Sequence, residues 1–480
     1  MKISYKTEAL SGVKWTSLSS VFITGGSFVV ILILTNILEK KDFGLFALVN
    51  IIVGFAAEFV DLGISQAIVQ KQDINEKQLS TLYWVNIFLS ILVFLVINIA
   101  SGFIANFFDE NDLSKLLSLV SFSFLFSGLS AQYQALLQKA LRFRLMASLD
   151  IIAFAVYLIV TLSLAFLGCG VYALVWGTLA RAGIKSFLLV ITGLKTHIPE
   201  LYLNLREVRY FLNFGSFRTG SFLISFLNTQ LDSIFIGRFI GVGELGVYDV
   251  FKRIVNQPLR LLVPIIQQVS YPLMSKANED KERVTQMFKK ILELLNAVRI
   301  PILLGITLVA PELTRILLGE EWAEKFSVLQ ILCLVITFRT MQAFFGQAMV
   351  ACGKPKWGFY NNVVMLPINL IVIYVGSFWG VLGVSIGLLI LAMVTMFPIY
   401  PVIIRRLFNI SFSQYLSLVF KDILIIFSVT LVILYVFERF ELTDGFSIIL
   451  KLSLFVVILI SYFLLFKRRM FIYVKYLLSN

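Results

Sequence analysis

Long apolar stretches alternate with short polar segments along the whole chain. Each stretch reaches about 20 residues, the length that an α-helix needs to cross a bilayer, and we predict about fourteen such helices. Their approximate cores are 15–37, 44–68, 79–105, 114–137, 146–167, 171–193, 211–238, 246–272, 288–310, 326–350, 357–378, 380–403, 418–437 and 446–466. Because the connections are short, the pattern predicts an all-α polytopic membrane protein with no large domain outside the bilayer.

The composition agrees with a membrane protein. Hydrophobic residues make up 59% and charged residues 14% of the 480 positions, whereas a soluble domain has about 25% charged residues. The three cysteines are scattered, so we predict neither a metal site nor a disulfide framework. The first apolar stretch has full spanning length and lacks a cleavage site, which predicts a retained helix and not a signal peptide.

The formal net charge of +13 is concentrated in every second loop. Loops 138–144 and 276–290 are basic, and acidic or neutral loops such as 107–112 and 319–325 alternate with the basic ones. In membrane proteins the cytoplasmic loops carry the excess of Lys and Arg. The alternation therefore predicts that both termini are cytoplasmic, and it explains the positive charge without a nucleic-acid partner.

The chain contains an internal repeat. Segment 34–50 resembles 236–252, with Gly44 and Gly246 at matching positions, and 170–177 resembles 380–387. A duplication of six helices gives two lobes of the same orientation around a central cavity. We expect an N-lobe over 1–195, an amphipathic cytoplasmic linker over 196–210, and a C-lobe over 211–408. The remaining residues, 409–480, are expected to form a helix pair and a basic cytoplasmic tail.

Two carboxylates, Glu58 and Asp61, lie in the predicted span 44–68. An ionisable residue inside a span costs at least about 2.5–3.5 kcal/mol on insertion scales, so it is a functional candidate. With Ser65 the pair has helical spacing, and the shared face must meet a partner or a water-filled cavity. The repeat matches Glu58 with Arg260 of the span 246–272. Either a structural ion pair between the lobes or contact with substrate or ion explains this arrangement.

Other ionisable residues inside predicted spans are secondary candidates: Asp232, Arg299 and Arg339. The span 246–272 also contains three prolines, which predict a bent, cavity-lining helix. We interpret Asp232 and Arg238 as caps of a helix end and Asp150 with Arg144 as an interfacial pair. His197 is interpreted as a solvated loop residue.

Several motifs in their order resemble one known family. They are "LSGVKWTSLSS" (10–20), "LEKKDFGLFALV" (38–49), "EFVDLGISQAIVQK" (58–71), "LQKALRFR" (137–144) and "LDSIFIGRFIG" (231–241). Together with the duplicated helices they resemble the multidrug/oligosaccharidyl-lipid/polysaccharide (MOP) exporter superfamily. Within it, the chain is most similar to Wzx-type polysaccharide flippases, in the lipopolysaccharide and teichuronic acid biosynthesis branch. The resemblance extends over the first twelve helices, and the last two agree with it only in number.

The resemblance implies a flippase of the bacterial cytoplasmic membrane. Such proteins carry an undecaprenyl-pyrophosphate-linked oligosaccharide to the outer leaflet by alternating access, for O-antigen, exopolysaccharide or capsule. Basic and amide side chains would hold the anionic headgroup: Lys14, Arg218, Arg253, Arg260, Gln267 and Gln268. Glu58 and Asp61 would couple transport to H⁺ or Na⁺, with no other cofactor. Besides the lipid-linked cargo and membrane lipids, a polysaccharide polymerase and a chain-length regulator are implied partners.

Three alternatives stay open. A multidrug or cation antiporter of the same superfamily is less favoured because cavity cations suit an anionic cargo. A lipid II flippase shares the fold, although its family typically has arginines where this chain has acids. A membrane polysaccharide polymerase or ligase would need a catalytic constellation, and we predict no catalytic residues and no enzyme.

Overall fold

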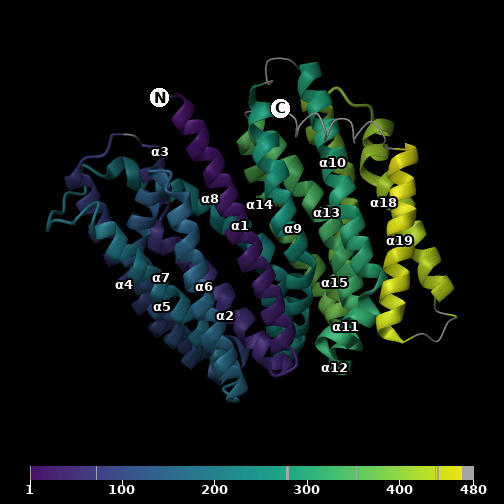
Figure 1. The fold of residues 1–480 in the computed structure, drawn as a ribbon, viewed down its shortest axis with the longest axis horizontal. Coiled ribbons are helices and arrows are strands. Elements are labelled where there is room, and N and C mark those ends of the chain that lie inside the picture. The colour runs from purple at the N-terminus through teal and green to yellow at the C-terminus, as the bar shows by residue number, and fades with distance from the viewer. Residues whose placement is uncertain are drawn as a thin grey trace. The chain divides into compact units, whose positions relative to one another are not determined.

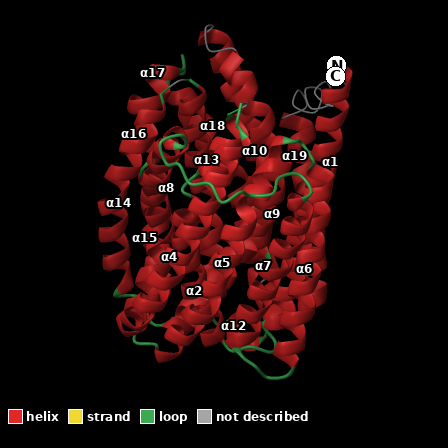
Figure 2. Ribbon diagram, turned by 90° about the vertical axis from the view of Figure 1, so that its left-hand side faces the viewer, coloured by secondary structure: helices red, strands yellow, loops and turns green. Residues whose placement is uncertain are grey.

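The computed structural model describes residues 2–71, 73–276, 281–352, 354–437, 439 and 443–466 (Figure 1). Every regular element among these residues is helical (Figure 2), which confirms the predicted fold class. Contacts between residues group the chain into two compact units, Met1–Asp249 and Val250–Asn480, with the division inside a helix. The predicted boundaries of the lobes and of the linker stay predictions.

The first unit begins with two long helices and contains most of the first half of the chain. Its elements are α1 (Lys2–Leu34), α2 (Lys40–Asp61), α3 (Ile64–Gln70), α4 (Glu76–Phe108), α5 (Asn111–Lys139), α6 (Phe143–Phe166), α7 (Val171–Leu194), α8 (Arg209–Phe235) and the π-helical turn η1 (Ile236–Ile240). Helix α9 (Val242–Lys276) starts in this unit and continues into the second.

The second unit contains the remaining helices. They are α10 (Lys281–Leu308), α11 (Ala310–Leu318), α12 (Glu320–Ala323), α13 (Phe326–Ala351), α14 (Pro355–Ser377), α15 (Gly380–Val394), α16 (Met396–Ile399), the π-helical turn η2 (Tyr400–Ile404), α17 (Arg405–Leu407), α18 (Phe412–Phe437) and α19 (Asp444–Phe466). Stacked aromatic rings fill its core, and the Phe288 and Phe408 ring centroids lie 4.1 Å apart.

Twelve helices of the described residues are long and apolar enough to cross a membrane. They coincide with twelve of the predicted spans. The other two predicted spans, 211–238 and 246–272, fall on α8 and α9, which are helical there but are not among the twelve. The chain is thus a multi-pass membrane protein, and the count of fourteen stays a prediction.

The predicted span 44–68 is not one helix. Helix α2 ends at Asp61, because Leu62 and Gly63 take left-handed backbone conformations with φ of 43° and 69°. Gly63 takes this conformation without the cost that a side chain would add. Helix α3 then starts at Ile64. Glu58 and Asp61 therefore lie at the end of a helix, and the expected helical face shared with Ser65 does not form.

The linker between α7 and α8 is irregular, and the predicted amphipathic cytoplasmic segment over 196–210 stays a prediction. Side chains at the start of α4 hold it: the Trp84 indole donates to the Glu200 carbonyl at 2.8 Å, and the Gln78 amide donates to the Glu207 carbonyl at 3.2 Å. His197 is buried here, contrary to the prediction of a solvated residue. Burial lowers the pKa of its imidazole, and the nearby Glu76 and Glu200 oppose that shift.

The two copies of the repeat meet at their matched glycines. A Cβ on Gly44 of α2 would lie 1.8 Å from the Val242 carbonyl oxygen, and one on Gly246 of α9 would lie 1.9 Å from the Lys40 carbonyl oxygen. Val242 is the residue that the repeat matches with Lys40. The contact is therefore reciprocal, as expected for two elements related by a twofold axis. Only glycine lets these backbones come so close.

We predict that Gly246→Ala lowers the stability of the protein by about 1–3 kcal/mol, the usual cost of overpacking. The added methyl group would overlap backbone atoms that cannot rotate away. Gly243→Ala is the matched control, since a Cβ at Gly243 of the same helix meets nothing within 4 Å. Thermal unfolding in detergent micelles measures both variants, and equal midpoints would contradict the close crossing.

Candidate functional site

The carboxylates of α2 lie beside a tight helix-to-helix turn. Glu58 and Asp61 are both half-buried. Asp61 accepts hydrogen bonds from the Ser65 backbone N–H at 3.1 Å and from the Ser65 hydroxyl at 2.5 Å. Its oxygen thus satisfies a backbone N–H in the first turn of α3, where none has an intrahelical partner. This contact gives Asp61 a structural role that the sequence pattern did not predict.

The predicted headgroup residues are described only in part. Lys14 is exposed on α1, Arg253 is half-buried on α9, and Arg260 is exposed on α9. The side chains of Arg218, Gln267 and Gln268 lie outside the described residues. Because Glu58 belongs to the first unit and Arg260 to the second, their meeting across a central cavity stays a prediction.

Asp232 connects two helices in the first unit. Its side chain is only 1% exposed, and it accepts hydrogen bonds from the Tyr248 hydroxyl and the Ser233 backbone N–H, both at 2.8 Å. Arg238 forms an ion pair with Asp109, the residue after α4, and its guanidinium lies 5.5 Å from the centroid of the Phe107 ring. Both residues thus have structural partners.

Asp150 does not form the predicted pair with Arg144. It pairs with Lys185 of α7 at 2.9 Å, while the Arg144 guanidinium lies over the Trp15 ring at 4.9 Å. The Asp150–Lys185 pair joins α6 to α7, which pack side by side in the first unit. The pattern suggested Arg144 because it is near in sequence, but the antiparallel hairpin brings Lys185 to the same level.

Arg299 of α10 is a buried cation in the second unit, with 1% of its surface exposed. One terminal nitrogen donates to the Asn296 side-chain oxygen at 2.6 Å, and the Asn296 amide donates to the Leu418 carbonyl of α18 at 2.9 Å. Its Nε and Nη1 have no hydrogen-bond partner among the described residues. Arg339, the other secondary candidate of this unit, is half-buried on α13.

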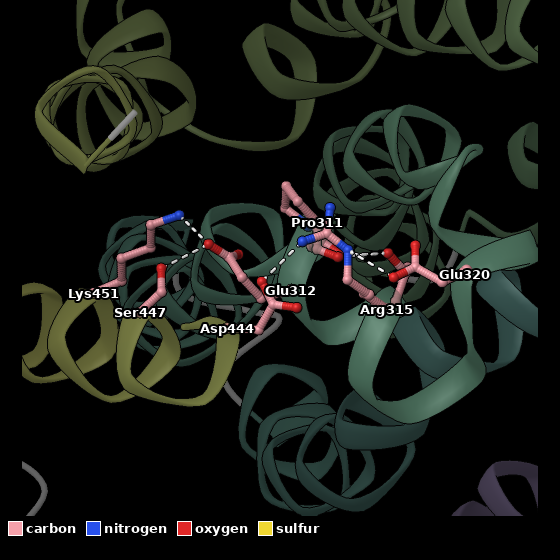
Figure 3. Close-up of polar contacts among 9 residues, drawn as sticks. Pro311, Glu312, Arg315, Glu320, Asp444, Ser447 and Lys451 are labelled. Atoms are coloured by element: carbon pink, nitrogen blue, oxygen red, sulfur yellow. Dashed lines mark hydrogen bonds and ion pairs between the residues drawn. The ribbon is translucent and has the colours of Figure 1, made fainter. Parts of the chain in front are cut away.

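A charged cluster between α11 and α19 was not predicted from the sequence (Figure 3). Glu312 forms an ion pair with Lys451 and accepts a hydrogen bond from the Ser447 hydroxyl at 2.8 Å. Both charged residues are only 7% exposed. Beside them, Arg315 pairs with Asp444 at 2.9 Å. A signal was present, because Lys451 is a lone charge in the predicted span 446–466.

Residues 33–327, more than half of the chain, match the family described as "Polysaccharide biosynthesis protein". The chain belongs to this family. The resemblance to polysaccharide flippases is thereby confirmed at the level of the family.

Two relatives of this polysaccharide biosynthesis protein are matched over most of their length. The chain is 29% identical over 416 residues to the lipopolysaccharide biosynthesis protein WzxC of Escherichia coli (strain K12), covering 86% of this chain and 84% of the relative. It is also 29% identical over 365 residues to the teichuronic acid biosynthesis protein TuaB of Bacillus subtilis (strain 168), covering 76% of each chain.

The structure of this family member is similar to a solved structure titled "Lipid II flippase MurJ, inward closed conformation". The TM-score is 0.75, and the superposition covers 96% of this chain and 100% of that chain. The sequence identity is 16%, so the likeness concerns the fold. The similarity agrees with the predicted MOP-type architecture.

We predict that Lys451→Met destabilises the protein by about 3–5 kcal/mol, because Glu312 would keep a buried charge without its partner. The double variant Glu312→Leu/Lys451→Met should recover most of this loss. Lys421→Met is the control, since Lys421 is exposed on α18 and its loss should change stability by less than about 0.5 kcal/mol. A double-mutant cycle by thermal unfolding measures the coupling, and additive effects would contradict it.

Proposed function

We propose that this protein flips undecaprenyl-pyrophosphate-linked oligosaccharide repeat units from the cytoplasmic to the outer leaflet of the bacterial cytoplasmic membrane. The observation that carries the proposal is the match to WzxC and TuaB over most of the chain. The MOP-type fold supports it, because this architecture suits alternating access between two lobes. The product would supply O-antigen, exopolysaccharide or capsule synthesis.

The proposed cargo explains why a membrane protein of this class needs basic side chains. A pyrophosphate-sugar headgroup is anionic and strongly hydrated, so it cannot cross hydrocarbon without compensating partners. Arg260 and Lys14 are exposed, which leaves their charged groups accessible to a ligand. Charge-assisted hydrogen bonds from these groups would hold the pyrophosphate. Arg218, Arg253, Gln267 and Gln268 complete the proposed headgroup site.

Coupling to H⁺ or Na⁺ is proposed for Glu58 and Asp61. Asp61 already holds the first turn of α3 through Ser65, so its exchange with an ion would cost that contact. Glu58 lies one helical turn earlier and is half-buried, where a carboxylate can exchange its cation between the inward and outward states.

The proposal includes orientation and partners. Both termini face the cytoplasm, as the alternation of basic loops predicts. A polymerase and a chain-length regulator would use the delivered repeat units at the outer leaflet. The protein itself makes or breaks no covalent bond. A lipid II flippase is the main alternative function. Unlabelled lipid II, added as a competitor in the transport assay, distinguishes the two cargoes, because it slows transport of the labelled oligosaccharide only if the protein also binds lipid II.

We expect Arg260→Ala to reduce transport by roughly tenfold to a hundredfold, the worth of one charged hydrogen bond of about 1.5–3 kcal/mol. Proteoliposomes loaded with a fluorescent polyprenyl-pyrophosphate oligosaccharide measure the rate by headgroup accessibility. Lys281→Ala is the control, because Lys281 is exposed at the start of α10. Equal rates for Arg260→Ala and the unmodified protein would remove α9 from the headgroup site.

A second variant tests the coupling role. Glu58→Gln keeps the shape of the side chain but cannot exchange a cation, so transport should lose its dependence on the pH or sodium gradient. Asp61→Asn serves for comparison and should mainly lower thermal stability, because Asp61 holds Ser65. An unchanged ion dependence in Glu58→Gln would end the coupling hypothesis while leaving the flippase proposal intact.

A further inference from the structure

The irregular linker between α7 and α8 has a row of exposed leucines. Leu201, Leu203 and Leu205 are 92%, 66% and 54% exposed, and we call these three the linker leucine row. The residues between them are half-buried and contact α4: the Tyr202 carbonyl accepts a hydrogen bond from the Thr81 hydroxyl, and the Asn204 backbone N–H donates to the same hydroxyl. The alternation is that of an extended chain, in which successive side chains point to opposite sides.

The attachment of the linker sets its depth. Helix α4 has 33 residues and is roughly 50 Å long at 1.5 Å per residue, more than the hydrocarbon thickness of about 30 Å. Within the predicted span 79–105, residues 85–105 alone are long enough to fill that thickness. The linker bonds to Gln78, Thr81 and Trp84, which precede this stretch. The leucine row therefore lies at the level where headgroups meet acyl chains.

The surface around the row is suited to lipid. Exposed side chains of α4, Phe88, Ile91 and Leu95, continue the apolar surface toward the hydrocarbon. Basic residues flank the row and are exposed: Lys195, Arg206 and Arg209. Among the acidic residues of the linker, Glu200 is exposed, while Glu207 is bonded to Tyr202 and Asn204. Three cations beside an apolar row match the anionic phosphates above the acyl chains.

Contacts with α4 satisfy part of the backbone polarity of the linker. An irregular segment can enter the membrane boundary only where its carbonyl and N–H groups have partners. Side chains of α4 donate to the linker carbonyls of Glu200, Tyr202 and Glu207. The polar edge of the linker is thus turned toward α4, and the leucine edge is turned away from the protein.

We propose that the linker leucine row inserts into the headgroup–acyl boundary of the bilayer, with Arg206 and Arg209 at the lipid phosphates. The segment between α7 and α8 is then held by lipid as well as by α4. In the orientation proposed above, this leaflet is the cytoplasmic one. The insertion itself does not depend on the flippase function or on the cargo.

Fluorescence quenching in liposomes tests the proposal on the full chain. Leu203→Cys is introduced after Cys169, Cys333 and Cys352 are replaced by alanine, and a bimane label is attached. The liposomes contain phosphatidylethanolamine and phosphatidylglycerol with brominated acyl chains, and iodide serves as the aqueous quencher. Glu76→Cys is the control, because Glu76 is exposed at the first residue of α4 and should remain in water.

Insertion predicts that brominated lipid quenches the label at position 203 and that iodide does so only weakly, with the opposite result at position 76. Strong iodide quenching at position 203 without lipid quenching would show a water-exposed row and overturn the proposal. Quenching by neither reagent would show a protein cover and would also overturn it. Leu201→Cys repeats the measurement independently, and gel filtration shows that each labelled variant is folded.

Discussion

The close crossing of Gly44 and Gly246 is the contact on which the duplicated fold depends. It joins α2 to α9, the second helix of each copy of the repeat. Gly44 lies against the Val242 carbonyl and Gly246 lies against the Lys40 carbonyl, and the repeat matches Val242 with Lys40. In lipid, helices gain little from burying apolar surface against each other, so close backbone approach supplies much of the attraction. A side chain on either glycine would remove that approach for both copies at once.

Polar side chains at the helix starts satisfy a second constraint of the bilayer, which is that backbone groups need hydrogen-bond partners. Asp42 of α2 accepts a hydrogen bond from the Val171 N–H at 3.0 Å, so one carboxylate serves the starts of both α2 and α7. Asp61 does the same for α3 through Ser65. Backbone N–H groups in the first turn of a helix have no intrahelical partner, and lipid offers none. Side chains that satisfy them therefore decide where the helices begin and end.

Apolar run length predicted the helices well, because a span is a property of about 20 consecutive residues. Breaks inside a run were not predictable in this way. The helix breaks at Leu62 and Gly63 within an otherwise apolar stretch, and a single glycine does not distinguish a turn from a helix. The partners of Asp150 and Lys451 were also out of reach, since pairing depends on which helices pack together. The bonds of the linker to α4 were out of reach for the same reason, although the alternation of its leucines with polar residues is visible in the sequence.

An intramembrane charge is a functional candidate by default, yet geometry divides the candidates of this chain into two groups. Asp232 is held by Tyr248, and Glu312 is held by Lys451 and Ser447, in buried surroundings. A site that must release its ligand needs groups that solvent and cargo can reach, since a fully buried pair costs several kcal/mol to break. Exposed Arg260 and half-buried Glu58 meet that requirement. We therefore propose the transport role for the charges that the fold leaves accessible, whereas the buried pairs hold helices together.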